Sequence, residues 1–313
     1  MSAPKPPPSG IWCPAVTFFD PDTDNLVPEA QAKYYSYLSK SGLAGLVILG
    51  TNAETFLLTR EERKKLVQIA REACPSLPLM AGAGGHSTRQ VLEYIQDAAD
   101  ADANYVLVLP PAYFGKATTP EVIENFFIDV ANKSSLPIVL YNFPGVCNGV
   151  DLDSATIAKL AKHDNIVGVK LTCGSVAKIT RLAAELSPER FAVYGGQSDF
   201  LIGGLSVGSA GCIAAFANVF PKTIVQIYNL YKAGKFKEAL ELHQKAALAE
   251  QPCKSGIAAT KYAAAIHAAK AAGIENAAHL LKPRHPYLEP SEAAEKAVVQ
   301  QMAEVSGIEQ TLA

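Results

Sequence analysis

Residues 137–172 read PIVLYNFPGVCNGVDLDSATIAKLAKHDNIVGVKLT, and this stretch contains the repeating unit that decides the fold. Short apolar runs stand at its two ends, at residues 137–142 and 166–172, and a helical segment lies between them. Apolar, β-branched runs joined by a crossover helix are typical of neighbouring parallel strands. The stretch therefore predicts a strand, a helix and a second strand parallel to the first.

The same unit recurs along the chain. Eight such runs occupy residues 11–18, 45–50, 78–83, 105–110, 137–142, 166–172, 191–196 and 210–216. Helix start signals stand between them: Thr59 and Glu62 have the capping-box spacing, and Thr119 precedes Pro120. Eight strand–helix repeats match an α/β fold of the (β/α)8 TIM barrel type, which takes ~250 residues, and an open doubly wound sheet is the alternative.

This pattern divides the chain into three parts. Residues 1–10 are proline-rich and are predicted to form a flexible N-terminal segment, and residues 11–220 make the barrel. Residues 221–313 carry only helical patterns, at 222–233, 236–250, 256–272 and 291–305. No Gly/Ser-rich linker precedes them, so we expect a helical C-terminal extension packed on the barrel.

Composition narrows the classes of function. The chain has 313 residues, 49% of them hydrophobic, and its formal net charge of -2 leaves no basic excess for nucleic acid or an anionic membrane. No stretch has the roughly 20 apolar residues that span a bilayer, and residues 1–10 resemble neither a secretory signal nor a transit peptide. The six cysteines are scattered without a CxxC pair, which predicts reduced thiols and a cytoplasmic protein.

One ionisable residue stands inside a predicted buried strand. Lys170 interrupts the apolar run 166–172 near its C-terminal end, where β/α barrels build their active sites. Burial lowers the pKa of a lysine ammonium, and the neutral amine attacks ketones to form an imine. The alternative is a lysine that pairs with a carboxylate or extends to the barrel rim.

Other polar residues stand at neighbouring strand ends. Thr172 lies on the same strand face as Lys170, and Tyr141 ends the preceding strand with a phenol that can move protons. The turn at residues 50–52 can present backbone N–H groups to a carboxylate. Each has a structural alternative: β-propensity for the threonine, packing for the tyrosine and an ordinary strand-to-helix connection for the turn.

Three motifs taken together resemble a known family. They are Gly50-Thr51-Asn52-Ala53-Glu54, Tyr141-Asn142-Phe143-Pro144 and Gly168-Val169-Lys170-Leu171-Thr172, at the ends of the second, fifth and sixth predicted strands. The set is similar to that of the dihydrodipicolinate synthase and N-acetylneuraminate lyase superfamily of class I, pyruvate-dependent aldolases. The resemblance extends from about residue 11 to the end of the chain and favours the catalytic interpretation of Lys170.

The resemblance implies roles for individual residues. Lys170 forms the imine, Tyr141 is the proton shuttle, and Thr51 acts in catalysis and binds the pyruvate-type carboxylate together with Asn52. Tyr113 matches a catalytic tyrosine that relatives lend across a tight dimer, which implies a homo-oligomer arranged as a dimer of dimers, a homotetramer. No metal and no organic cofactor is required. The other substrate-binding residues expected at strand ends are Thr172, Gly195, Gln197, Ser198 and, through its backbone carbonyl, Ile213.

Departures from the family pattern narrow the expected substrate. Val146 stands where true dihydrodipicolinate synthases have an arginine for the second substrate's carboxylate. Among the predicted strand ends only Lys170 is cationic, with Lys116 farther along a loop, so a phosphorylated or second acidic group lacks a partner. Thr172 instead resembles the hydroxyl residue of relatives that cleave hydroxylated keto acids, and Asn52 resembles the hydroxy-oxoglutarate and 2-keto-3-deoxy sugar acid aldolases.

The sequence therefore favours a Schiff-base aldolase that cleaves an unphosphorylated 2-keto-3-deoxy sugar acid to pyruvate and an aldehyde such as L-glyceraldehyde. The preferred substrate is L-threo-3-deoxy-hexulosonate, of galacturonate degradation. The first alternative is 4-hydroxy-2-oxoglutarate, which needs a cation for its second carboxylate. A dihydrodipicolinate synthase-like condensation, and a non-catalytic barrel that binds a keto acid, stay open, whereas a metal-dependent aldolase needs ligands that His86 alone does not supply.

Overall fold

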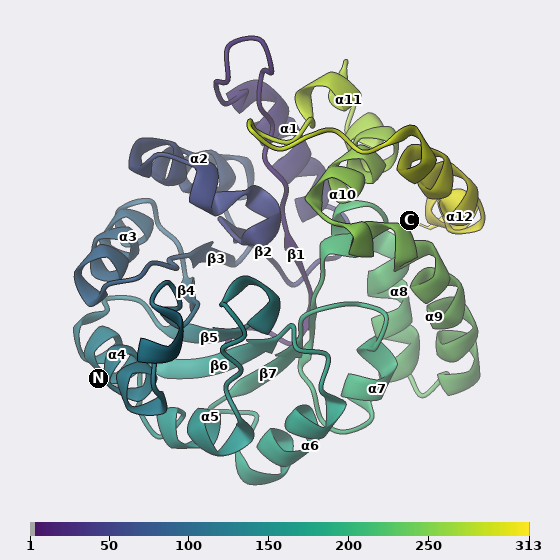
Figure 1. The fold of residues 1–313 in the computed structure, drawn as a ribbon. Helices are drawn as coiled ribbons and strands as arrows, with labels where there is room; N and C mark the ends of the chain where they lie inside the picture. Colours follow the sequence, from purple (N-terminus) through teal and green to yellow (C-terminus); the bar gives the residue numbers. More distant parts are fainter. Residues whose placement is uncertain (1–3, 313) are drawn as a thin grey trace.

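The computed structural model describes residues 4–312, in which eight parallel strands close into a barrel (Figure 1). The strands pair in sequence order, and β8 returns to β1, where Trp12 lies opposite Ile213. This closure confirms the predicted (β/α)8 barrel and excludes the open sheet. The strands are β1 (Gly10–Pro14), β2 (Gly45–Ile48), β3 (Leu79–Gly82), β4 (Tyr105–Val108), β5 (Ile138–Asn142), β6 (Ile166–Leu171), β7 (Ala192–Gly195) and β8 (Gly211–Ile213).

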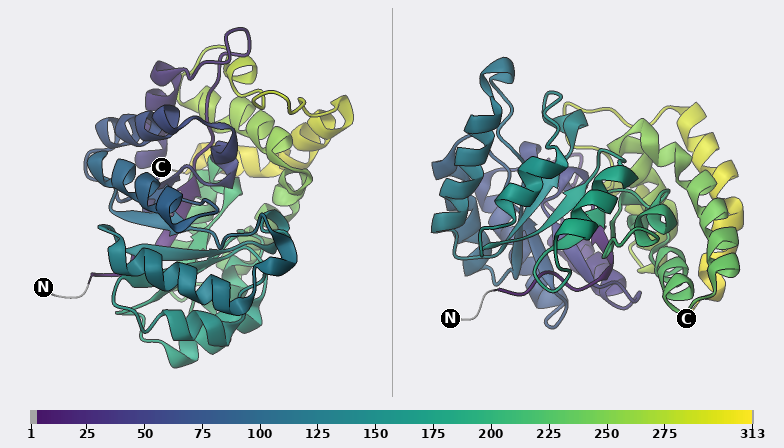
Figure 2. Two further views of the ribbon diagram at one scale, coloured as in Figure 1. Left: turned by 60° about the vertical axis from the view of Figure 1, so that its left-hand side comes forward. Right: turned by 90° about the horizontal axis from the view of Figure 1, so that it is seen from below.

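Helices follow the strands and surround them (Figures 1 and 2). Thr59 and Glu62 form the predicted capping box at the start of α2, each side chain accepting a hydrogen bond from the other's backbone N–H. Thr119 likewise caps α4 ahead of Pro120. The helices are α1 (Pro28–Ser39), α2 (Arg60–Ala73), α3 (Thr88–Asp100), α4 (Pro120–Lys133), α5 (Ser154–Leu160), α6 (Val176–Glu185), α7 (Leu201–Leu205) and α8 (Pro221–Lys232).

Further helices lie on one side of the barrel (Figure 2). They are α9 (Phe236–Glu250), the short η6 (Gln251–Ser255), α10 (Ile257–Ala264), the π-turn η7 (Ala265–Ala269), α11 (Ala277–Leu280) and α12 (Glu292–Thr311). α8 packs against β1, whereas α9 and α12 pack on α8 and on each other. Because α8 packs on a barrel strand, it is the eighth helix of the barrel. The extension therefore begins at α9, at residue 236, and not at residue 221.

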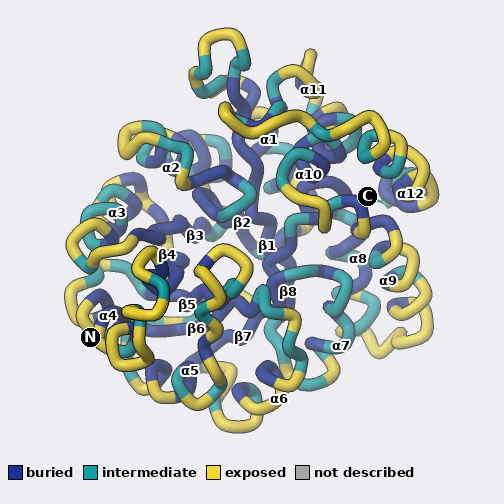
Figure 3. Tube along the Cα trace, viewed as in Figure 1, coloured by how far each residue is buried: buried dark blue, intermediate teal, exposed yellow. Residues whose placement is uncertain are grey.

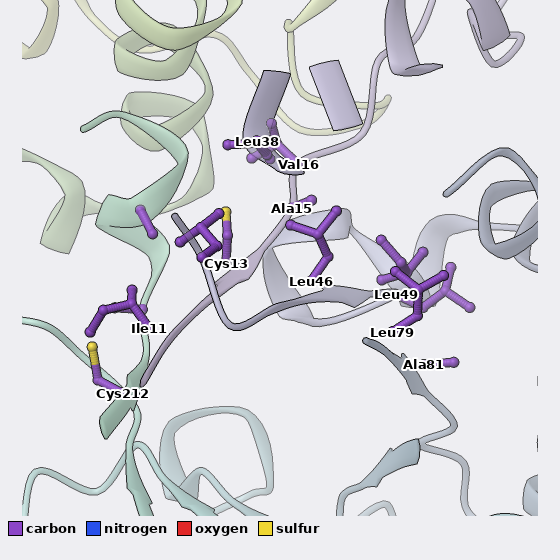
Figure 4. Packing of buried hydrophobic residues seen from close by; sticks show 14 of the residues in the cluster. Ile11, Cys13, Ala15, Val16, Leu38, Leu46, Leu49, Leu79, Ala81 and Cys212 are labelled. Atoms are coloured by element: carbon purple, nitrogen blue, oxygen red, sulfur yellow. The ribbon is translucent and has the colours of Figure 1, made fainter. Parts of the chain in front are cut away.

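Side chains alternate between the two faces of the barrel strands. On β1, Ile11 and Cys13 point outward and pack with residues such as Leu46 in the layer between strands and helices (Figure 4). Trp12, between them, belongs to the interior of the barrel. Figure 3 shows the same division, with buried strands and exposed outer faces of the helices. The strand period of two thus separates an outer core from an inner one.

Residues 6–10 close the N-terminal end of the barrel. The Trp12 indole donates a hydrogen bond to the carbonyl of Pro8 at 3.0 Å, and the Tyr194 hydroxyl donates to the carbonyl of Pro7 at 2.8 Å. Gly10 is already the first residue of β1. The prediction of a flexible segment over residues 1–10 therefore fails for residues 6–10, and residues 1–3 lie outside the described part of the chain.

Within residues 4–312, no helix is long and apolar enough to cross a membrane.

Candidate active site

Lys170 lies on the inner face of β6, close to the C-terminal end of the strand. Val169 and Leu171 on either side of it pack in the outer core, so the alternation of the strand turns Lys170 into the barrel. The residue is only 2% exposed. Among the described residues, the only hydrogen-bond partner of its amine is the Tyr141 hydroxyl, at 3.2 Å. A buried lysine without a carboxylate partner is the arrangement that imine chemistry needs.

Tyr141 is brought to Lys170 by the pairing of β5 with β6, in which the two residues lie opposite each other. The Lys170 amine also lies 4.2 Å from the centre of the Tyr141 ring. On its other side, the Tyr141 hydroxyl is 3.3 Å from the hydroxyl of Thr51, in the turn η1 (Thr51–Ala53) that follows β2. Amine, phenol and threonine hydroxyl form a continuous chain along which a proton can move.

A cavity of about 230 Å³ opens beside this chain. Six of the predicted site residues line it: Thr51, Asn52, Tyr141, Lys170, Thr172 and Gln197. They come from the ends of β2, β5, β6 and β7, as expected for a barrel whose active site forms at the C-terminal ends of the strands. Phe143, Gly196 and Ala215 complete the barrel side of the cavity.

The Thr172 hydroxyl is buried and has no hydrogen-bond partner among the described residues. Gly196 lies against it, and a Cβ at that glycine would come within 2.0 Å of the Thr172 oxygen. A buried hydroxyl without a partner costs stability, and because Thr172 lines the cavity, its hydroxyl is placed to bind a substrate atom. The predicted role of Thr172 as a substrate ligand therefore stays a prediction with geometric support.

Three other predicted ligands lie outside the lining of the cavity. The Ser198 hydroxyl donates a hydrogen bond to Glu250 at 2.5 Å, and its carbonyl lies 2.7 Å from the ring nitrogen of His243. The Ile213 side chain is fully buried in the inner core, and Gly195 sits within β7. Ser198 is thus a support for Glu250 in this structure rather than a group that faces the cavity.

Tyr113 lies in the connection between β4 and α4, outside the lining of the Lys170 cavity. It is 75% exposed and borders a separate cavity of about 410 Å³ rather than the one that contains Lys170. Its ring packs against His86 and Phe114, with centroid distances of 5.9 and 5.3 Å. Any catalytic role of Tyr113 must therefore be exercised in a partner subunit, as the resemblance implies, and this role stays a prediction.

A second wall of the cavity comes from the C-terminal extension, in which the sequence predicted no site residues. Its lining residues are Glu250, Cys253, Lys254, Gly256, Ile257 and Thr260. The Lys254 ammonium donates hydrogen bonds to Gln197 at 2.7 Å and to Glu250 at 3.0 Å. Burial raises the pKa of the Glu250 carboxyl above its ordinary value. The cavity thus has a second cation, which the sequence analysis missed.

A buried ion pair joins the extension to the segment that contains η1. The Lys261 ammonium of α10 lies 2.6 Å from the carboxylate of Glu54, and both side chains are buried. Glu54 directly follows η1 and has a left-handed backbone conformation with φ of 56°. The same carboxylate accepts a hydrogen bond from the backbone N–H of Arg284 at 2.8 Å. α10 and the chain after α11 are therefore fastened to the turn that carries Thr51.

No three His, Cys, Asp or Glu side chains gather into a possible metal site anywhere in residues 4–312.

A closed barrel with an enclosed lysine on β6 and a tyrosine on the neighbouring strand defines the class of lysine-dependent, Schiff-base barrel lyases. Comparison with known proteins agrees with this class and narrows it. The profile of the dihydrodipicolinate synthetase family matches residues 7–304, and the chain belongs to that family.

Individual relatives are similar over nearly the whole chain. A Coccidioides immitis protein provisionally named as a mitochondrial 4-hydroxy-2-oxoglutarate aldolase is 70% identical over 308 residues, which cover 98% of each chain. An L-threo-3-deoxy-hexylosonate aldolase of Hypocrea jecorina is 39% identical over 274 residues, 83% of this chain and 87% of that one. The crystal structure of a dihydrodipicolinate synthase family protein from Coccidioides immitis has a TM-score of 0.94 at 65% identity and full coverage of both chains.

These comparisons confirm the predicted superfamily and the lyase class, and they change two other predictions. The relative with 70% identity bears the name of the alternative substrate, 4-hydroxy-2-oxoglutarate, so the comparisons favour that alternative over the sugar acid. The prediction of a cytoplasmic protein is wrong on the same comparison, because that relative is named mitochondrial. The scattered cysteines and residues 1–10 were insufficient grounds for the cellular location.

Proposed function

We propose that this protein is a mitochondrial aldolase that cleaves 4-hydroxy-2-oxoglutarate to pyruvate and glyoxylate through a Schiff base on Lys170. The observation that carries the proposal is the buried Lys170 amine, bonded only to the Tyr141 hydroxyl among the described residues and open to a small cavity. The choice of substrate is supported by the 70% identical relative and by Lys254 in the cavity wall.

The first half of the reaction builds the imine. The Lys170 amine attacks the C2 ketone, and the Tyr141 hydroxyl at 3.2 Å carries protons to the carbinolamine oxygen until it leaves as water. Thr51, 3.3 Å from the same phenol, passes the proton on. The C1 carboxylate then lies at the turn formed by Thr51 and Asn52, both of which line the cavity.

The second half breaks the carbon–carbon bond. The protonated imine accepts the electron pair of the C3–C4 bond while Tyr141 removes the proton of the C4 hydroxyl, and C4 leaves as the aldehyde of glyoxylate. The resulting enamine takes a proton at C3, and water releases pyruvate from Lys170. In this scheme the unpartnered Thr172 hydroxyl binds the C4 oxygen in the uncleaved substrate.

The second candidate substrate is L-threo-3-deoxy-hexulosonate, the substrate preferred from the sequence alone. It is favoured by the Hypocrea jecorina relative and by the polar groups Thr172 and Gln197 at the cavity, which suit a hydroxylated tail. It would make the same imine on Lys170 and differ only in the aldehyde released. Assay of pyruvate release from both substrates decides between them.

A homo-oligomer completes the proposal. Tyr113, His86, Phe56 and Phe114 form an exposed aromatic patch, and patches of this kind commonly mark protein interfaces. Through this patch Tyr113 would reach the proton-transfer chain of a second copy.

The test is reduction with borohydride in the presence of pyruvate. We expect one stable adduct, found by mass spectrometry on the peptide that contains Lys170 and missing in Lys170→Ala. Lys261 is a matched control within the protein, because it is also buried but is paired with Glu54. A protein that releases pyruvate from its substrate yet gains no adduct would exclude the imine mechanism.

A further inference from the structure

We infer that Lys254, on η6 of the C-terminal extension, is the specificity residue that binds the second carboxylate of the substrate, with Glu250 as its resting counter-ion. The inference rests on the proposed function and goes further, because it assigns the choice of substrate to a residue outside the barrel. η6 joins α9 to α10, which lie beside the barrel (Figure 1).

The position of Lys254 fits this role. Of the residues that line the Lys170 cavity in the described chain, Lys254 is the one cation besides Lys170 itself. Lys170 lies on a strand of the barrel and Lys254 on the extension, and both line the same cavity. A keto acid whose ketone is bound at Lys170 can therefore extend its far end toward Lys254.

The contacts of Lys254 are of two kinds. Glu250 is a fixed partner, 3.0 Å away, with a side chain only 3% exposed and its other oxygen held by Ser198 at 2.5 Å. Gln197 at 2.7 Å and Asp199 at 3.0 Å are replaceable partners on the side chain's exposed side. Of the three donors of the ammonium group, two form hydrogen bonds with Gln197 and Glu250, and Asp199 makes a third close contact. A substrate carboxylate can take the place of Gln197, whose amide then turns to donate its own N–H.

The surroundings favour a charged partner over a neutral one. The Lys254 side chain is 28% exposed, so the ammonium is partly removed from water and a hydrogen bond to a carboxylate is stronger there than in solution. A hydroxylated tail offers only neutral acceptors and would leave the pair with Glu250 unchanged. Lys254 thus distinguishes a dicarboxylate from a keto acid of similar length with an uncharged end.

Two substitutions should act in opposite directions. Lys254→Met keeps the length of the side chain and removes the charge, so it should lower kcat/KM for 4-hydroxy-2-oxoglutarate by about 10- to 100-fold, mainly through KM. Glu250→Gln removes the competing charge, while the amide oxygen can still accept from Lys254 and the amide N–H can donate to the Ser198 hydroxyl. It should lower KM for the same substrate several-fold.

The measurement is the ratio of kcat/KM for 4-hydroxy-2-oxoglutarate to that for 4-hydroxy-2-oxopentanoate, which has a methyl group in place of the second carboxylate. We expect the ratio to fall about 10-fold or more in Lys254→Met and to recover in part in Lys254→Arg. Lys270→Met is the control, because Lys270 belongs to the same extension and lies outside the lining of the cavity. Its ratio should equal that of the unmodified protein.

Failure of this inference differs from failure of the proposed function. If the unmodified protein cleaves 4-hydroxy-2-oxoglutarate and Lys254→Met leaves the ratio of the two kcat/KM values unchanged, Lys254 does not bind the second carboxylate. The proposed function then stands. An equal loss on both substrates, with loss of the borohydride adduct with pyruvate, also overturns the inference, since Lys254 would then only maintain the cavity. If the unmodified protein forms the adduct but does not cleave the dicarboxylate, the proposed function itself fails.

Discussion

Lys170 and Tyr141 show how a single strand pairing creates a reactive pair of residues. The amine is enclosed, and the phenol both accepts its hydrogen bond and contacts Thr51, so in the proposed mechanism one hydroxyl would serve the two proton transfers of imine formation and bond cleavage. Neither residue needs a loop to reach the other, because each stands on a strand of the rigid barrel. Sites held by regular elements keep their geometry better than sites on loops.

Tyr141→Phe should slow turnover by ~100-fold or more, because general acid–base groups contribute on this scale. The buried ring is retained, so the substitution should leave the melting temperature nearly unchanged. Steady-state pyruvate release gives the rate, and borohydride trapping at long incubation shows that Lys170 is still accessible. A rate within a few-fold of the unmodified protein would remove Tyr141 from the mechanism.

Thr172→Val should separate stability from activity at one site. Valine has the shape of threonine without the hydroxyl, so the substitution removes a buried polar atom that has no partner within residues 4–312. We expect the free energy of unfolding to rise by about 1 kcal/mol while kcat/KM falls about 10-fold. Urea unfolding and pyruvate release measure the two, and Thr172→Ser should retain most of the activity. A variant that is both less stable and fully active would contradict the role in substrate binding.

At the scale of elements, the attachment of α10 to η1 decides whether the cavity keeps its second wall. The Lys261–Glu54 pair makes this attachment, and desolvation by burial lowers the pKa of the Lys261 ammonium to about 8. Glu54 of this pair lies two residues after Asn52 in the chain. The position of η1 and the position of the extension are therefore coupled.

Lys261→Met should cost about 3–5 kcal/mol of stability, because it leaves the Glu54 carboxylate buried without its cation. The double variant Glu54→Gln, Lys261→Met should recover part of that loss. Lys245→Met breaks the exposed pair with Glu304 and is the control, expected to cost less than about 1 kcal/mol. The measurement is chemical unfolding of all three variants. A loss for Lys261→Met no larger than that of the control would show that the pair does not fasten the extension.

The π-turn η7 and α12 meet at His267. The His267 ring packs on Phe220 at 4.6 Å between centroids, and its Nδ1 lies 3.3 Å from the Ser306 hydroxyl of α12. Desolvation lowers the pKa of His267 to about 4. An unfolded histidine titrates near 6.5, so between about pH 6.5 and 4 the unfolded state binds more protons and stability falls as the pH falls.

His267→Phe should remove part of this acid sensitivity while it keeps the aromatic packing. We expect the difference in unfolding free energy between pH 7 and pH 5 to be smaller in the variant than in the unmodified protein. His163→Phe, at a half-buried histidine that forms a hydrogen bond with Asn132, should leave that difference unchanged. Equal pH dependence in both variants would show that His267 is not the group responsible.

At the scale of the whole molecule, the proposed roles of Lys170 and Tyr113 require two subunits for one active site. Lys170 is enclosed in its own barrel, whereas Tyr113 is exposed in a patch of aromatic side chains. If Tyr113 acts across an interface, each active site takes residues from two chains. A C2 dimer brings the same patch of both copies together, which makes such an exchange symmetric.

Co-expression of Lys170→Ala with Tyr113→Phe tests this exchange. Each variant alone should be inactive or slow. Lys170→Ala lacks the amine, and Tyr113→Phe lacks the hydroxyl that is proposed to act in the partner's active site. Random mixing puts a complete site into about a quarter of the positions, so about a quarter of the activity of the unmodified protein should return. If the mixture shows no more than the sum of the separate variants, Tyr113 does not act in a partner's site.

Much of the architecture followed from local patterns. The eight apolar runs predicted the strands because buried parallel strands require such runs, and the Thr59–Glu62 spacing predicted the start of α2 because amides at helix starts need acceptors. Lys170 and Tyr141 could be placed together since the ends of neighbouring parallel strands meet at one end of a barrel. These features depend on residues near one another in the sequence or on the order of the strands.

The sequence by itself thus determined the barrel and the neighbouring positions of Lys170 and Tyr141 near its strand ends. Only the tertiary structure decided that Lys254 lines the cavity, that Ser198 turns to Glu250, and that Tyr113 stands outside its own active site. A helical pattern states which face of a helix is apolar, but it contains no information on which part of the barrel that face will cover. That position is set by contacts between distant segments, such as the pair formed by Lys261 and Glu54.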